Sequence, residues 1–135
     1  MTDTTTFIFQ LLKVATRIER RLDRALSATK GVSFTEFHLL KELQDKHNGA
    51  ATRVDLANAS GLTASAITRA LKPLEKIGFV VTEKSEHDAR RSIARLTSAG
   101  NELLSDASRI VEDEIALLNL PDDELDAALR VMSLL

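Results

Sequence analysis

The sequence predicts a mainly α-helical protein of the α+β class, in which several helices accompany one short β-hairpin. Apolar residues recur at three- and four-residue intervals over most of the 135 residues, which is the spacing of amphipathic helices. After Gly78 the pattern changes, because strand-forming residues begin at Phe79 and return in residues 92–96. Apolar residues make up 44% of the chain, which is enough to build one core. We therefore expect a single domain over residues 1–135.

Local signals indicate where the long helices begin. Residues 5–28 alternate apolar and charged positions in the pattern of one amphipathic helix. Ser33, with Glu36 three residues later, predicts a capping box at the start of a second helix. After the hairpin, Thr97 is a candidate cap for another long helix, and Pro121 precedes a last helix whose first turn is rich in carboxylates.

Two short helices joined by a tight turn are predicted before the hairpin. Ala57 is small enough to let these helices approach, Gly61 can adopt the positive φ of the turn, and Ile67 can fill the space between them. This spacing is typical of a helix-turn-helix. Together with the hairpin over about residues 79–96, it predicts a winged helix-turn-helix core over residues 33–97.

The second of these helices, about residues 64–77, carries the candidate DNA-reading surface. In such motifs this helix enters the major groove, where Arg69 could bind guanine and Ala66 could contact a thymine methyl group. The residues expected at this surface are Thr63, Ser65, Ala66, Thr68, Arg69 and Lys72. The alternatives are a simple helix cap at Thr63 and a solvated helix face at the basic positions. Pro73 is expected either to bend this helix or to mark where groove contact ends.

The tip of the hairpin is the second candidate surface for DNA. Arg90 is assigned to a groove contact, because the negative potential of a narrow minor groove attracts arginine. Lys84 and Arg91 lie beside it, and Asp88 is assigned the structural role of orienting a basic neighbour. The alternative is a loop that only keeps the protein soluble.

The charge is distributed unevenly along the chain. A net charge of −2 by itself argues against a nucleic-acid ligand. Residues 63–95, however, contain seven basic and four acidic side chains, whereas residues 101–135 contain two basic and nine acidic ones. A basic middle with an acidic end is compatible with DNA binding, although solvated helix faces would give the same distribution.

Several other classes of protein are disfavoured. The chain has no cysteine for disulfides or thiolate metal sites, and its three histidines lie on separate predicted elements, so neither a metal site nor a cofactor is expected. No nucleophile with a base, phosphate loop or catalytic carboxylate pair is apparent, so an enzyme is not expected. There is no secretory signal, and no run approaches the roughly 20 apolar residues of a membrane helix, so we expect a cytoplasmic protein.

Three segments resemble the MarR family of winged-helix regulators, and the resemblance extends over nearly the whole chain. They are residues 62–69, residues 74–80, and the Asp-x-Arg sequence at Asp88 that leads to Leu-Thr-x-x-Gly at residues 96–100. The last is the most specific. The resemblance implies a homodimer with a recognition helix and a wing in each subunit. It also implies that the first helix and the last two helices interlock, often with a small aromatic or phenolic effector bound between the two regions.

The apolar stripes of the chain independently predict a dimer. The terminal helices, residues 5–28 and 98–135, expose more apolar surface than a small winged domain can cover, so they are assigned to dimerisation. A two-fold dimer would bind an imperfect palindrome in double-stranded DNA. Phe34, Phe37 and His38 are the candidate effector pocket; the alternative is that both phenylalanines are core residues and that the histidine bonds a neighbour.

The predicted function is therefore that of a sequence-specific DNA-binding transcriptional regulator. Repression, with release by a small effector, is the expected mode of action. Two alternatives remain at this stage. The same fold could serve as a protein-interaction module, or it could bind DNA without responding to any effector.

Overall fold

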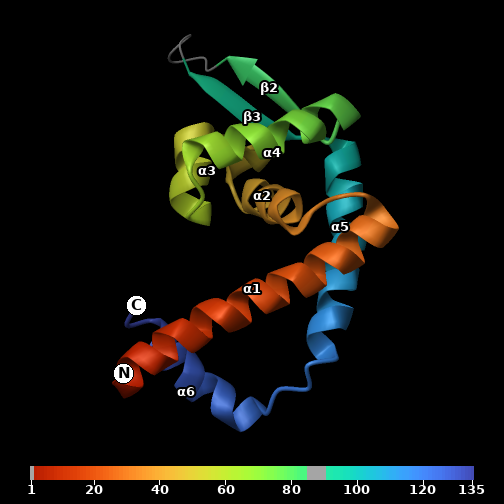
Figure 1. Ribbon diagram of the computed structural model, residues 1–135. Helices are drawn as coiled ribbons and strands as arrows, with labels where there is room; N and C mark the ends of the chain where they lie inside the picture. Colours follow the sequence, from red (N-terminus) through yellow and green to blue (C-terminus); the bar gives the residue numbers. More distant parts are fainter. Residues whose placement is uncertain (1, 85–90) are drawn as a thin grey trace.

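The computed structural model describes residues 2–84 and 91–135, and it has the mainly helical fold with a small antiparallel sheet that was predicted (Figure 1). The elements are α1 (Asp3–Lys30), α2 (Phe34–Gln44), the short 3-10 turn η1 (His47–Gly49), β1 (Ala50–Thr52), α3 (Arg53–Ser60), α4 (Ala64–Ile77), β2 (Val80–Lys84), β3 (Ser92–Leu96), α5 (Ser98–Ala116) and α6 (Asp122–Met132). None of the described helices is both long enough and apolar enough to cross a membrane.

The molecule has a compact lobe and an extended helical part. The lobe contains α2, α3, α4 and the sheet, and α1, α5 and α6 extend away from it (Figure 1). The helix α4 and the hairpin lie at one end of the molecule, α1 and α6 lie at the other end, and α2 lies between them. Leucine and isoleucine side chains from both parts form one core, and the most completely buried are Leu26, Leu39, Leu40, Leu43, Leu56, Ile67, Leu71, Leu74 and Leu104.

The helices begin where the local signals predict. The Ser33 hydroxyl accepts a hydrogen bond from the Glu36 backbone N–H at 3.0 Å, and the Glu36 carboxylate accepts one from the Ser33 backbone N–H at 2.8 Å. This reciprocal capping box starts α2. Thr63 caps α4 by accepting a bond from the Ala66 backbone N–H at 3.1 Å. These interactions span only three residues, which is why the sequence alone predicts them.

The strand β1 was not predicted. Its three residues, Ala50–Thr52, pair antiparallel with β3, so the sheet has the order β1-β3-β2. Ala51 lies opposite Ala94, and both side chains are buried in the core. An Ala-Ala-Thr segment carries no strand signal of its own, because alanine has a low β-propensity. The strand forms because β3 lies beside it.

The first turn of α5 lies unusually close to the chain that leaves α4. Thr97 caps α5 by accepting a bond from the Gly100 backbone N–H at 3.0 Å, and its hydroxyl donates to the Gly78 carbonyl oxygen at 2.7 Å. A β-carbon at Gly100 would lie 2.2 Å from the Phe79 carbonyl oxygen. The Leu-Thr-x-x-Gly sequence therefore has a structural reason: the threonine joins two elements, and only glycine fits at the point of contact.

Candidate nucleic-acid interface

The helices α3 and α4 form the predicted helix-turn-helix. Gly61 adopts φ of 75° at the end of α3, the left-handed conformation that glycine adopts without steric cost. Ile67 is fully buried and Ala57 packs against the same core, so these two residues occupy the space between the helices. The turn orients α4 so that one face packs on the lobe and the other faces solvent.

The solvent face of α4 carries most of the residues expected to contact DNA. Its inner face is apolar, with Ile67, Leu71 and Leu74 completely buried. The outer face repeats at three- and four-residue spacing and is exposed; it consists of Ser65, Thr68, Arg69, Lys72 and, one turn further, Lys76. The face therefore combines hydroxyl groups at the start of the helix with three positive charges along it.

The remaining positions on α4 differ in their surroundings. Ala66 is half-buried, and the Thr63 hydroxyl serves as the helix cap. A capping hydroxyl still has a proton that it can donate to a phosphate, so the cap and a DNA contact are compatible. Pro73 is exposed, and the helix continues through it without interruption from Ala64 to Ile77. Pro73 directly follows Lys72, and the exposed residues of α4 that carry a hydroxyl or a guanidinium group all precede it.

The described part of the wing places two basic side chains beside the open end of the hairpin. Strands β2 and β3 pair antiparallel, with Lys84 opposite Ser92, and Lys84 and Arg91 are both exposed. Figure 1 shows the hairpin on the same side of the lobe as α4. Asp88 and Arg90, which were assigned the orienting and groove-contact roles, lie outside the described residues.

Arg95, which contributes to the positive charge of the middle segment, is engaged within the protein. Its guanidinium donates to the Glu83 carboxylate of the neighbouring strand at 3.2 Å. It also donates to the backbone carbonyl oxygen of Asn48 at 3.1 Å. Arg95 thus joins both strands of the wing to the turn before β1. Sequence reasoning had counted it only as part of a basic segment.

A second contact that sequence reasoning missed is centred on Glu75. Its carboxylate accepts a hydrogen bond from the Thr82 hydroxyl on β2, and it lies 3.6 Å from the guanidinium of Arg53 on α3. Glu75 therefore connects α4 to both the other helix of the motif and the wing. The sequence offers no local signal for this role, because its partners lie 7 residues ahead and 22 residues behind it.

We expect Glu75→Ala to lower the affinity for the protein's DNA site about fivefold, because the lost hydrogen bond to Thr82 weakens the positioning of the wing by about 1 kcal/mol. Glu75→Gln keeps the acceptor for Thr82 and should recover most of this loss. Titrations of labelled duplex DNA with the two variants test the prediction, and equal affinities for Glu75→Ala and wild type would contradict it.

The candidate effector residues do not all face the same space. Phe34 and His38 line a small cavity of about 130 Å³ together with Glu19, Thr35, Ser60 and Leu62. Their rings meet edge-on, with centroids 6.0 Å apart. Phe37 instead belongs to the core, with only 8% of its surface exposed. His38 Nε2 lies 3.6 Å from the Glu42 carboxylate and has no hydrogen-bond partner among the described residues.

Comparison with known proteins extends this description. A family model described as MarR family matches residues 32–92, which include α2, α3, α4 and β2 and end at the first residue of β3. The DNA-bound structure of Sco3205, a MarR family transcriptional regulator from Streptomyces coelicolor, superposes with a TM-score of 0.88 at 25% identity and covers 99% of this chain and 86% of Sco3205. Residues 32–92 of this chain thus match the MarR family model, and the chain has the fold of a MarR family regulator.

Two further proteins are similar to this chain. The transcriptional regulator BldR from Sulfolobus solfataricus has the same fold, with a TM-score of 0.87, 22% identity and complete coverage of both chains. The HTH-type transcriptional regulator FarR from Neisseria gonorrhoeae is 36% identical over 66 residues. That match spans 49% of this chain and 45% of FarR, so it covers less than half of either protein.

Proposed function

We propose that this chain is a MarR-family regulator, that it binds an imperfectly palindromic DNA site as a homodimer, and that it represses transcription until a small aromatic effector releases it. The single observation that carries the DNA-binding part is the exposed face of α4. That face carries the exposed residues Ser65, Thr68, Arg69 and Lys72, and Figure 1 shows α4 on the same side of the lobe as the wing. A helix with this composition fits the major groove, and its hydroxyls and cations can bind both phosphates and bases.

The dimer is supported by apolar surface that the chain does not cover. Every residue of α6 is exposed, and the helix ends in a segment with Leu129, Leu134 and Leu135 exposed by 66%, 84% and 70%. The N-terminal half of α1 exposes Phe9 and Leu12 in the same way. Contiguous apolar surface of this kind marks an interface. Two copies related by a two-fold axis would present their recognition helices about one turn of DNA apart.

The response to an effector is supported by the position of the small cavity. Phe34 and His38 come from α2, whereas Ser60 ends α3 and Leu62 lies in the turn that leads into α4. A ligand that enlarges this cavity would therefore push on the element that orients the recognition helix. Because about 130 Å³ is smaller than the roughly 300 Å³ of an ordinary ligand pocket, binding would require such an enlargement.

Binding to chromosomal DNA also implies a cytoplasmic location.

The decisive experiment is selection of bound sequences from random duplex DNA with the full-length protein. We expect an enriched imperfect palindrome, and binding to it that weakens steeply with added salt because phosphate contacts release counterions. Absence of any enriched palindrome would favour the alternative, a winged-helix module that docks on a protein. A palindrome that no small aromatic molecule dissociates would instead indicate a DNA-binding protein without an effector.

The assignment of Arg90 is tested on the same duplex. We expect Arg90→Ala to lower the affinity severalfold and to reduce the slope of log K against log salt by about one, because one cation near the phosphates is lost. The oligomeric state should not change. Sedimentation and duplex titrations at several salt concentrations measure both quantities. Wild-type affinity in this variant would remove the wing tip from the proposed interface.

A further inference from the structure

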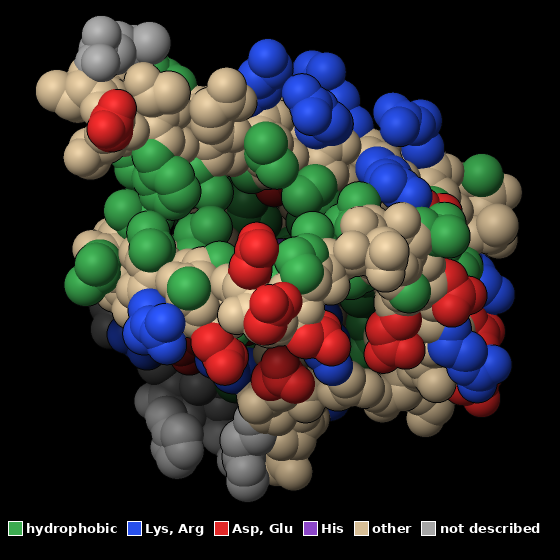
Figure 2. All heavy atoms as spheres, turned by 90° about the horizontal axis from the view of Figure 1, so that it is seen from below, with side chains coloured by type: hydrophobic (Ala, Val, Ile, Leu, Met, Phe, Trp, Pro, Cys, Tyr) green, Lys and Arg blue, Asp and Glu red, His purple; other side chains and the backbone are tan. Residues whose placement is uncertain are grey.

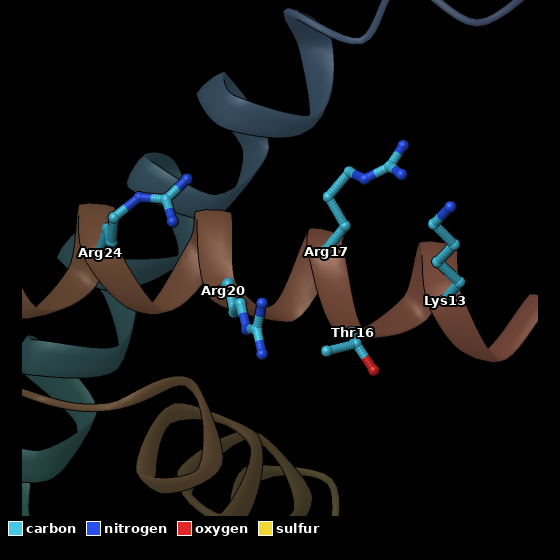
Figure 3. Close-up of a pocket in the computed structure, with 5 residues that line it drawn as sticks. All are labelled: Lys13, Thr16, Arg17, Arg20 and Arg24. Carbon is cyan, nitrogen blue, oxygen red and sulfur yellow. The ribbon is translucent and has the colours of Figure 1, made fainter.

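Four basic side chains on α1 form a stripe whose role the DNA interface does not explain. They are Lys13, Arg17, Arg20 and Arg24, and with Thr16 they surround an open hollow of about 470 Å³. Their three- and four-residue spacing places them along one side of the helix. Figure 3 shows Lys13, Arg17 and Arg24 projecting together, whereas Arg20 and Thr16 project on the other side of the hollow. We call these four side chains the basic stripe.

The basic stripe has no anionic partner in the described part of its own chain. Two other cations of α1 do pair with α5: Arg21 with Glu114 at 2.8 Å and Lys30 with Asp106 at 3.3 Å. Among residues 2–84 and 91–135, no carboxylate oxygen lies within 4.0 Å of a stripe nitrogen. Like charges at this spacing on a helix repel one another, so the isolated protomer gains nothing from them.

The position of the stripe separates it from the proposed DNA surface. Figure 1 shows α1 at the end of the molecule opposite α4 and the hairpin, with α2 between them. A DNA duplex bound by α4 and the wing would therefore lie on the other side of the lobe. The phosphates of that duplex are not the anions that the stripe faces.

A complementary acidic surface lies at the other end of the same chain. Its six carboxylates are all exposed: Glu112 and Asp113 near the end of α5, and Asp122, Asp123, Glu124 and Asp126 on α6. We call these side chains the acidic end. The apolar residues Leu125, Leu129 and Met132 repeat at helical spacing beside them on α6 and are also exposed.

The side of the molecule on which α1 and α6 lie carries both charges and exposed apolar side chains (Figures 1 and 2). In Figure 2, which shows the molecule from below, basic side chains gather along one border of the face and acidic side chains extend across its middle. Exposed apolar side chains lie between these groups. A single face of the protomer thus carries positive charge, negative charge and an apolar surface side by side, which is the pattern of a self-complementary interface.

We propose that a second copy of this chain covers this face, with the basic stripe of each protomer opposite the acidic end of its partner. This inference rests on the homodimer of the proposed function and adds the contacts that select its geometry. In a two-fold interface every contact occurs twice, so the pairing of α1 with the partner's α6 is automatically reciprocated. Packing α1 against the partner's α1 would bring the two basic stripes together, and their like charges would repel each other.

Reciprocal charge reversal tests the pairing directly. The first variant reverses the stripe (Arg17→Glu with Arg24→Glu), and the second reverses the acidic end (Asp122→Lys with Asp126→Lys). We expect each variant alone to raise the dimer Kd about tenfold or more, because like charges now face each other across the interface. An equimolar mixture of the two should associate as a heterodimer with nearly wild-type Kd, because both contacts are then attractive. Sedimentation equilibrium of full-length proteins measures these constants.

Two controls separate pairing between chains from other effects. Lys41→Glu with Lys46→Glu makes the same change of charge on the lobe and should leave the dimer Kd unchanged. Raising the salt concentration from about 0.05 M to about 0.5 M should weaken the wild-type dimer, because screening shortens the range of the attraction. The same rise in salt should weaken the dimers of the charge-reversed variants less than the wild-type dimer, or even strengthen them. Loss of helix stability in the α6 variant would not be rescued by mixing, so rescue identifies contacts between protomers.

The outcomes distinguish this inference from the proposed function. If both variants dimerise as wild type does and still bind the selected palindrome, the charge pairing is wrong and the homodimer stands. If mixing fails but all four substitutions in one chain restore the dimer, the stripe and the acidic end pair within one chain, which also overturns the inference. A wild-type chain that stays monomeric and binds no palindrome would contradict the proposed function itself.

Discussion

Replacing Arg69 with alanine is expected to lower the affinity for the selected DNA site about tenfold to a hundredfold. A bidentate arginine–guanine contact contributes roughly 1–3 kcal/mol of discrimination, and Arg69 is the exposed side chain of α4 best suited to make it. In the described part of the chain, no carboxylate holds it in an ion pair. Titrations with the selected palindrome, and with duplexes changed at single base pairs, measure the loss and locate the base concerned.

The pattern of the loss matters as much as its size. If Arg69 reads a base, Arg69→Ala should relax the preference at one position of each half-site, whereas Lys72→Ala should weaken all sequences equally. Arg109→Ala removes the same charge from an exposed position on α5 and serves as the control, with affinity expected within about twofold of wild type. Unchanged affinity and base preference in Arg69→Ala would exclude α4 as the reading element.

Gly100→Ala is expected to destabilise the fold by about 2 kcal/mol, even though alanine is the better helix former. The added methyl group would lie 2.2 Å from the Phe79 carbonyl oxygen and 2.7 Å from the Leu96 side chain, so the backbone must shift. Overpacking against backbone costs up to about 3 kcal/mol, and the gain in helix propensity offsets only about 1 kcal/mol. Urea denaturation followed by circular dichroism measures the change.

A matched substitution isolates the steric effect. Ser98→Ala lies in the same first turn of α5 but is exposed, so it should change stability by no more than about 0.5 kcal/mol. An increase in stability for Gly100→Ala would mean that α5 can move away from Phe79 without cost. In that case the glycine of the Leu-Thr-x-x-Gly sequence would need another explanation than this close approach.

The sequence predicted the elements that depend on near neighbours. The caps at Ser33, Thr63 and Thr97 each involve a partner three residues away, so the pattern of residue types contains the whole interaction. Gly61 adopts its positive φ because of the turn that it occupies. The exposed face of α4 could also be predicted from the sequence, because the helical period separates the apolar side of the helix from its polar side.

The contacts that position the candidate interface could not be predicted in this way. Glu75 meets partners on α3 and β2, and Arg95 meets Glu83 together with a carbonyl oxygen 47 residues away. Each of these residues resembles an ordinary surface charge in the sequence. Their roles depend on distances that only the packed chain defines, and one of them removes a cation from the surface thought to attract DNA.

The sequence by itself determined the helices, the turn of the motif, the hairpin and the polarised distribution of charge, because these depend on period, local capping and composition. The tertiary structure decided that Ala50–Thr52 forms a strand, that Phe37 belongs to the core while Phe34 and His38 line a cavity, and that α6 is left uncovered. The physical reason is that pairing and burial are set by elements distant in the chain. A periodic pattern identifies an apolar face, but only the packed structure shows what covers it.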